Sequence, residues 1–248
     1  MPLPCFPRSL FTTLALLCAF GTLASTALAD ASAAEPRYGH SRFFRFHADF
    51  LDRGKAGPVG LLFLGDSITH AWDRHPELWE QAWGDYDPAN FGHGGDQTQH
   101  VIWRITQGEL DNITPKVVVL LIGTNNLHHY EAPEIVAANR KIIGLIQEKL
   151  PDTKVLLLAV FPRGPRTNGR GIVEDHELHM RKINAINAEL AQMENSDSIR
   201  YLDLGPKFMS ADGTLARAIM PDQLHLSAAG YEIWVEGMKP LVDKMMAE

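Results

Sequence analysis

Three side chains of this sequence could together carry out acyl transfer. Ser67 follows an apolar run that ends in Gly65 and Asp66, so it is expected at the carboxyl end of a buried strand, where the chain turns sharply. Asp222 and His225 are three residues apart, so one turn of the chain can place the carboxylate beside the imidazole. A serine hydroxyl is a weak nucleophile that needs a base within hydrogen-bond reach, and that base needs a third group to fix its tautomer. The three residues therefore predict a nucleophile, Ser67, activated by His225 and Asp222.

Acyl transfer also needs hydrogen-bond donors for the negatively charged oxygen of its tetrahedral intermediate, and the sequence offers three. The backbone N–H of Gly95 lies in a glycine-rich turn, and Asn125 brings a side-chain amide after a second apolar run. The backbone N–H of Ser67 is the third donor. Removing one such donor typically lowers the rate by roughly 10² to 10³. Gly92 and Gly94 of the same turn are interpreted as residues that only make it tight.

Each of these residues also has a structural interpretation. Asp66 or Ser67 could cap the helix that follows the strand. Asn125 could be a turn residue, because asparagine tolerates left-handed backbone geometry. Asp222 could cap a turn, and His225 could be a satisfied polar residue. The presence of this pair together with Ser67 favours the catalytic interpretation.

Strands that alternate with helices would bring these residues together. Strands are predicted for the apolar run that starts at Val59 and for residues 86–91, 116–122, 154–160 and 199–204, and helices for residues 41–53, 68–72, 72–83, 97–110, 132–150, 173–193 and from Ser227 onward. Five such alternations predict one α/β domain with a five-stranded parallel sheet, right-handed crossovers and helices on both faces. Loops that leave the carboxyl ends of parallel strands meet at one edge of the sheet, where ligands bind.

Four short blocks of the sequence match, in order, the blocks of a known family. They are GDSI at residues 65–68, GGD at 94–96, GTN at 123–125 and Asp-x-x-His at 222–225. In these blocks the chain resembles the GDSL or SGNH hydrolase superfamily. Longer stretches such as NFGHGGDQTQHVIWRITQGEL and DQLHLSAAGY are similar to the platelet-activating-factor acetylhydrolase catalytic subunits, and this resemblance extends over the chain from about Gly57 onward.

The resemblance implies a three-layer, flavodoxin-like α/β fold with no cofactor. It implies Ser67 as the nucleophile, with Asp222 and His225 completing the triad. The oxyanion hole is implied to consist of the Ser67 N–H, Gly95 and Asn125. The eukaryotic members of the group are cytosolic, so their lipid substrate and their partners are not carried over to this chain.

The first 29 residues have the composition of a secretory signal peptide. Arg8 precedes an apolar stretch at residues 10–23, and small residues at 27–29 predict cleavage after Ala29, with a second site offered by residues 31–33. The apolar stretch is short of the ~20 residues of a membrane span, so no stable membrane anchor is expected. The domain organisation is therefore a signal peptide at 1–29, a linker and helix at 30–56 and a hydrolase domain at 57–248, and the mature protein is expected to be periplasmic or secreted.

The composition of the chain limits the classes of partner and the covalent cross-links that can be expected. Both cysteines, Cys5 and Cys18, lie in the expected signal peptide, so the mature protein would contain neither thiol nor disulfide. A net charge of −7 without a basic patch argues against nucleic acid as the partner. A homodimer is as compatible with the sequence as a monomer. Trp72, Trp79 and Trp83 form either a lid or internal packing.

Histidines outside the triad raise the question of a metal site. His128 and His129 are adjacent, so their side chains diverge, and His176 and His179 share a helix face without a third ligand in view. Structural zinc is usually four-coordinate, so no metal is expected. Three other histidines near the predicted site are expected to shape its pocket, namely His70, His93 and His100.

The sequence thus predicts an exported serine ester hydrolase that removes short acyl groups, acetyl above all, through an acyl-enzyme on Ser67. Its substrate would be a small-molecule, carbohydrate or lipid ester, and export favours carbohydrate O-acetyl groups over an intracellular phospholipid. A phosphotransferase acting through Asp66 is the first alternative, although Ile68 stands where such enzymes carry a second aspartate. A non-catalytic carbohydrate- or partner-binding module is the second alternative. Such a module would be expected to have lost at least one of the four sequence blocks, and all four are intact here.

Overall fold

The computed structural model describes Met1, residues 30–195 and residues 197–248, so the predicted signal peptide lies outside the described residues except for Met1. Five strands form one parallel sheet in the order β2-β1-β3-β4-β5. They are β1 (Leu61–Gly65), β2 (Pro88–Gly92), β3 (Val117–Leu121), β4 (Lys154–Leu158) and β5 (Ile199–Leu202). The predicted five-stranded parallel sheet is confirmed.

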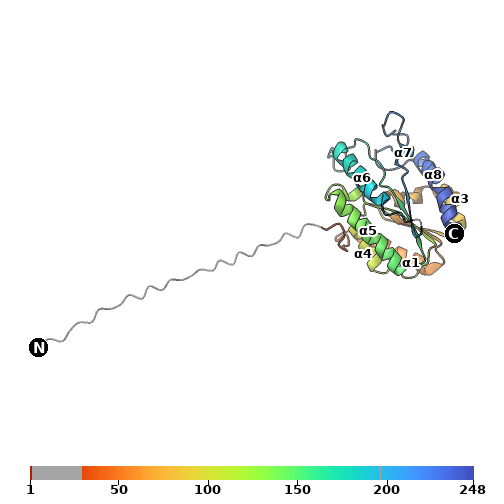
Figure 1. Cartoon of the computed structure of the whole chain (residues 1–248), viewed down its shortest axis with the longest axis horizontal. Coiled ribbons are helices and arrows are strands. Elements are labelled where there is room, and N and C mark those ends of the chain that lie inside the picture. The colour runs from red at the N-terminus through yellow and green to blue at the C-terminus, as the bar shows by residue number, and fades with distance from the viewer. Residues whose placement is uncertain (2–29, 196) are drawn as a thin grey trace.

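Helices cover both faces of the sheet, which gives three layers (Figure 1). They are α1 (Ser41–Ala56), α2 (Ser67–His70), α3 (Pro76–Trp83), α4 (Thr98–Thr106), α5 (Ala132–Lys149), α6 (His176–Ala191), α7 (Gly205–Phe208) and α8 (Ala228–Ala247), with short 3₁₀ turns at Ala71–Arg74, Gly84–Tyr86 and Thr124–Asn126. Within the described residues, no helix combines the length and the apolar character that a membrane span requires.

Three helices are clearly shorter than the sequence predicts. The predicted helix at 72–83 begins only at Pro76, because Ala71–Arg74 form a separate 3₁₀ turn. The predicted helix at 97–110 ends at Thr106, because Gly108 takes a left-handed conformation (φ +95°) in which the helix cannot continue. The predicted helix at 173–193 begins only at His176, since the Asp175 carboxylate caps it by accepting the Leu178 N–H. The residues before this cap double back on themselves, with Thr167 paired antiparallel to Val173.

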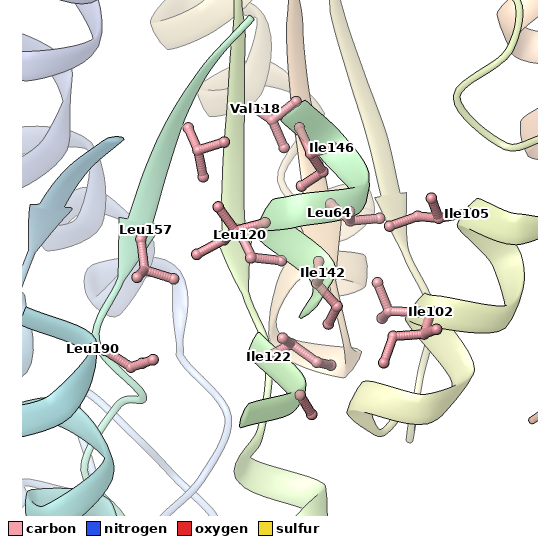
Figure 2. Packing of buried hydrophobic residues seen from close by; sticks show 14 of the residues in the cluster. Leu64, Ile102, Ile105, Val118, Leu120, Ile122, Ile142, Ile146, Leu157 and Leu190 are labelled. Carbon is pink, nitrogen blue, oxygen red and sulfur yellow. The ribbon is translucent and has the colours of Figure 1, made fainter. Parts of the chain in front are cut away.

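Successive side chains of each strand point to opposite faces, so the sheet builds a separate apolar cluster on each side. On one face, Leu64, Val118, Leu120 and Leu157 pack against helices α4, α5 and α6 (Figure 2). On the other face, a second set of strand residues packs against α3 and α8. Because both faces are covered, the central strands are apolar without interruption, as is typical of a parallel sheet.

The tryptophans form internal packing. Trp72 and Trp83 are buried, and Trp79 packs against the same cluster. All three rings lie against Phe63 of β1, with centroid separations of 6.2, 4.8 and 5.5 Å for Trp72, Trp79 and Trp83. Their role is therefore to fix α3 and the segment after Ser67 on the sheet.

The strand order places a topological switch point between β1 and β3. From β1 the chain passes to β2 on one side of it, and then to β3 on the other side. The loops after these strands diverge there and leave a crevice at the carboxyl edge, the usual ligand site of an open α/β sheet. Ser67, Gly95 and Asn125 follow β1, β2 and β3 respectively, so the fold brings them to this crevice.

Candidate active site

Ser67, His225 and Asp222 form a continuous hydrogen-bonded chain. The Ser67 Oγ lies 2.9 Å from His225 Nε2, and His225 Nδ1 lies 2.7 Å from Asp222 Oδ2. An ionised carboxylate can only accept hydrogen bonds, so His225 Nδ1 carries the proton and Nε2 is left to accept the serine hydroxyl. This is the arrangement in which an imidazole can remove the proton from a serine. The three predicted residues, 158 positions apart at the extremes, are therefore brought together.

The local fold at Asp222 holds its carboxylate ionised. Oδ1 accepts the backbone N–H groups of Leu224 and His225 at 3.1 and 2.7 Å. Partial burial alone would raise the pKa of Asp222, but the hydrogen bonds from the His225 ring and backbone hold that pKa well below its usual value. The turn requires a left-handed backbone at Gln223 (φ 64°), whose buried side-chain amide donates to the carbonyls of Leu215 and Met220.

Ser67 is the first residue of α2, directly after β1. The Asp66 carboxylate caps this helix by accepting the Ile68 N–H at 2.9 Å. Asp66 thus caps the helix, as one interpretation of the sequence predicts. The Ser67 hydroxyl also lies within hydrogen-bond reach of His225, as the other interpretation predicts. Desolvation in its fully buried position raises the pKa of Asp66 to about 7.

Three donors near Ser67 are available to an oxyanion. The backbone N–H groups of Ser67 and Gly95 donate to no other backbone group among the described residues. The Asn125 Nδ2 donates one of its two hydrogens to the Asp96 carbonyl at 2.8 Å, which leaves the second available. Gly95 adopts φ +79°, a left-handed conformation that favours glycine at this turn.

The buried carboxylate of Asp96 organises the loop that carries Gly95. Its Oδ1 is 2.8 Å from His93 Nδ1, and its Oδ2 accepts from Arg104 Nε at 3.0 Å. Arg104 is itself fully buried and also bonds Glu109 and the Phe91 carbonyl. Neither Asp96 nor Arg104 was predicted from the sequence to have a role. A lone arginine on the apolar side of a helix was the signal that could have indicated this support.

The loops after β2 and β3 are tied to each other. Gln97 Nε2 donates to the Asn125 carbonyl at 2.9 Å. The neighbouring Asn126 is buried, accepts the Thr98 N–H at 3.0 Å and donates to the Thr98 hydroxyl at 2.9 Å. Both adjacent asparagines thus join the loops, but only Asn125 also lines a cavity, whereas Asn126 is fully buried.

The glycine at position 92 has a different role from the predicted one. Gly92 is the last residue of β2, and a Cβ there would lie 2.2 Å from the backbone nitrogen of His70. It therefore allows α2 to approach the sheet, which sets the position of Ser67. Gly94 does lie in the turn, as predicted.

Two cavities lie close to the Ser67 crevice, with Gly94 in the wall of one and Gly95 in the wall of the other. One, of about 430 Å³, is lined by Ser67, His70 and His225. The other, of about 700 Å³, begins at Gly95 and Asn125. Its walls are mixed: Arg163, Arg166, His128, Asn168 and Glu174 stand beside apolar side chains such as Leu127 and Val173. Of the histidines expected to shape the pocket, His70 lines a cavity, whereas His93 and His100 lie behind it near Asp96.

Two of the histidines considered for a metal site, His128 and His179, lie instead against a buried ion pair. His128 Nε2 and His179 Nδ1 lie 3.6 and 3.8 Å from the carboxylate of Glu174, which also pairs with Arg163. Burial and the nearby Arg163 lower the pKa of His179 to about 4, so this ring is neutral at neutral pH. The part of the chain that the structure describes holds no group of three or more His, Cys, Asp or Glu suited to a metal ion.

Comparison with known proteins identifies the family. The sequence profile of the GDSL-like lipase/acylhydrolase family matches residues 63–233, from β1 into α8. The chain belongs to this family. Platelet-activating factor acetylhydrolase IB subunit alpha1 of Pongo abelii is 33% identical over 210 residues, which cover 85% of this chain and 87% of that protein. The alpha2 subunit of Rattus norvegicus is 32% identical over 221 residues, covering 87% and 90%.

Solved structures share the fold of this GDSL-like chain. A GDSL-like lipase from Bacteroides thetaiotaomicron superposes with a TM-score of 0.67 at 20% identity, covering 80% of this chain and 97% of that one. A carbohydrate acetylesterase family member from Sinorhizobium meliloti gives 0.59 at 16% identity, covering 77% and 100%. Family membership makes the chain a carboxylic ester hydrolase, as the sequence predicts.

Proposed function

We propose that this GDSL-like hydrolase is an exported enzyme that removes short acyl groups, acetyl above all, from an ester through an acyl-enzyme formed on Ser67. The observation that carries the proposal is the unbroken chain from Ser67 Oγ through His225 to Asp222, at 2.9 and 2.7 Å. The free N–H groups beside it supply the second requirement of acyl transfer, because they can receive the oxyanion.

The residues divide the reaction as follows. The Ser67 oxygen attacks the ester carbonyl carbon while His225 Nε2 takes its proton, and Asp222 stabilises the imidazolium. The oxyanion of the tetrahedral intermediate accepts hydrogen bonds from the Ser67 and Gly95 N–H groups and from Asn125 Nδ2. The intermediate collapses, the C–O bond to the alcohol breaks, and His225 returns the proton to the alcohol. Water then attacks the acyl-enzyme by the same route and releases the carboxylic acid.

A carbohydrate acetyl ester is the substrate class that the site supports best. The larger cavity presents charged and amide groups such as Arg166, Asn168 and Glu174, which suit hydroxyl-rich ligands more than an acyl chain. The proposed signal peptide would place the enzyme in the periplasm or outside the cell, where acetylated polysaccharides are met. One structural neighbour is named a carbohydrate acetylesterase family member.

A lipid acetyl ester is the second candidate. It is favoured by the names of the similar curated proteins, which are platelet-activating factor acetylhydrolase subunits. Release of acetate from acetylated xylo-oligosaccharides and from an acetyl glycerophospholipid, measured side by side, separates the two candidates. Faster release from the phospholipid would reverse the preference.

The triad is tested with p-nitrophenyl esters of two, four and eight carbons. We expect activity on the acetate that falls with acyl length. The change Ser67→Ala should abolish it, lowering kcat by a factor of roughly 10⁴ or more, because the residue that forms the acyl-enzyme is gone. Ser210→Ala, at an exposed serine far along the chain, is the matched control and should keep full activity. Equal turnover in wild-type protein and Ser67→Ala would refute the proposal.

A further inference from the structure

Arg37 lies in the predicted linker that precedes α1, and its side chain reaches the proposed oxyanion hole. Its Nη1 donates to the Gly94 carbonyl at 2.6 Å. The guanidinium also lies against Gly95, where a Cβ would be 3.1 Å from Nη1 and 3.2 Å from Nη2. A cation therefore sits directly on the peptide that joins these two glycines.

This peptide is the one that supplies an oxyanion donor. The Gly94 carbonyl and the Gly95 N–H are the two ends of one planar unit, and no cis peptide bond occurs in the described residues. In a trans peptide the C=O and the N–H point in opposite directions. Arg37 thus binds the carbonyl oxygen of this peptide. The N–H of the same peptide is one of the three donors proposed for the oxyanion.

We propose that Arg37 is a positioning residue of the oxyanion hole, which fixes the plane of the Gly94–Gly95 peptide and strengthens the Gly95 N–H as a donor. The inference rests on the proposed function. A charged donor forms a shorter and stronger hydrogen bond than a neutral one, and hydrogen bonds in series polarise each other. A donor that is already oriented needs no reorganisation when the oxyanion forms, which is the basis of electrostatic stabilisation.

A simple surface ion pair explains the contact less well. The nearest carboxylate, Asp96 Oδ1, is 3.9 Å from Arg37 Nη1, and Asp96 already bonds His93 and Arg104. The Gly94 carbonyl is a neutral acceptor at only 2.6 Å. The arginine is thus directed at the peptide and not at the charge.

The segment that carries Arg37 is anchored to the same loop. Ala31 is fully buried, and its carbonyl accepts the Thr98 hydroxyl at 2.8 Å. The Glu35 N–H donates to the Gln99 carbonyl at 3.2 Å. Thr98 and Gln99 begin α4, directly after the loop that carries Gly95. Residues 30–38 and this loop are therefore held as one unit. Residues 30–38 belong to the active site in this proposal.

The first test is the kinetics of Arg37→Met and Arg37→Lys on p-nitrophenyl acetate. We expect Arg37→Met to lower kcat by about tenfold or more, less than the roughly 10² to 10³ that loss of a donor itself costs, with KM within about twofold. Arg37→Lys should recover part of the loss, because an ammonium can still donate to the carbonyl. Arg140→Met, at an exposed arginine of α5, is the matched control.

Two further readouts separate this role from a merely structural one. A boronic acid that forms a tetrahedral adduct on Ser67 should bind Arg37→Met more weakly by the factor by which kcat/KM falls, while product inhibition by acetate stays unchanged. Millimolar guanidinium should restore activity to Arg37→Ala and not to Ser67→Ala. Wild-type kcat in Arg37→Met, or a loss of kcat with undiminished boronate affinity, would overturn the proposal. An inactive wild-type protein would instead overturn the proposed function.

Discussion

The Asp66 carboxyl group is buried beside Ser67 and is poorly solvated. One oxygen accepts the Ile68 N–H, and the other has no hydrogen-bond partner among the described residues. Desolvation is the dominant effect and raises the pKa of Asp66 to about 7. The acid that caps α2 is therefore partly protonated near neutral pH.

This raised pKa predicts how stability depends on pH. In the unfolded chain the pKa of Asp66 is the ordinary aspartate value of 3.8, whereas in the folded chain the group keeps its proton up to about pH 7. The folded state binds more protons across this window, so the contribution of Asp66 to stability declines as pH rises from about 4 to about 7, by on the order of 3 kcal/mol. Urea unfolding of wild-type protein and Asp66→Asn across this range measures the difference.

The comparison with Asp66→Asn isolates this one group, because every other titrating residue is shared. Asp49→Asn, at an exposed position of α1, serves as the control and should run parallel to the wild-type protein at all pH values. A difference between wild type and Asp66→Asn that is constant from pH 4 to pH 7 would contradict the assignment.

At the residue scale the sequence predicted the polar residues that follow the strands. It did not predict the side chains that hold the loops of those residues in place. Ser67 and Asn125 were predictable because each follows an apolar run, Gly95 because it lies in a glycine-rich turn, and Asp222 and His225 because their spacing matches a single turn. Arg37 was not predictable, because its contact with the Gly94 carbonyl spans 57 positions and no local pattern marks it. Asp96 and Arg104 carried only a weak signal, an arginine among apolar residues of its helix, and their contacts with each other appear only when the helix is packed.

Helix α4 is the element that links the core to the loop that carries Gly95. Its apolar side contributes Ile102 and Ile105 to the cluster of Figure 2, and on the same helix the buried Arg104 bonds Asp96, Glu109 and the Phe91 carbonyl. The burial of Glu109 and of Asp96 is compensated by this one guanidinium. Arg104 therefore holds together the helix, the end of β2 and the loop between them.

Replacing this arginine should be costly. Arg104→Met leaves two buried carboxylates without their main partner, and breaking a buried ion pair from one side typically costs about 3–5 kcal/mol. Chemical denaturation should show this loss in the free energy of unfolding. Arg181→Met, at an arginine of α6 with a side chain 65% exposed, should change it by less than about 0.5 kcal/mol. Equal stability of the two variants would contradict the structural role.

At the element scale the sequence predicted every strand, and its errors lie at helix ends. Apolar runs such as 117–121 define strands because both faces of the sheet are buried. The start of α6 was misplaced because Val173 continues the apolar pattern, yet it is 78% exposed in the turn before the Asp175 cap. Periodicity could not reveal that the chain pairs with Thr167 there.

The whole molecule is held by two apolar clusters that share the strands of one sheet. Leu156 and Leu157 are consecutive residues of β4, and they point into opposite clusters. Both are buried, with 0% and 1% of their surface exposed. Because every central strand contributes to both sides, we expect the two layers to unfold together.

This expectation is tested by truncating each leucine separately. Leu156→Ala and Leu157→Ala should each lower the free energy of unfolding by about 2–5 kcal/mol, through lost burial and a residual cavity. In both variants fluorescence from the tryptophans, four of which (Trp72, Trp79, Trp83 and Trp234) lie on the Leu156 side, and far-ultraviolet circular dichroism should report one coincident transition. If Leu157→Ala left the unfolding transition seen by tryptophan fluorescence unshifted, the two apolar clusters would unfold independently. Val173→Ala, at an exposed position, is the control.

The two margins of the sheet have a consequence for how the protein behaves at high concentration. An open sheet ends in strands whose outer backbone groups can template a strand from another molecule. Here one margin, β2, opens with Pro88, and the other, β5, has only four residues and carries Arg200. A proline, a short strand and a cation are features that discourage edge-to-edge pairing. The sheet is thereby protected against fibril-like aggregation without a barrel closure or a covering partner.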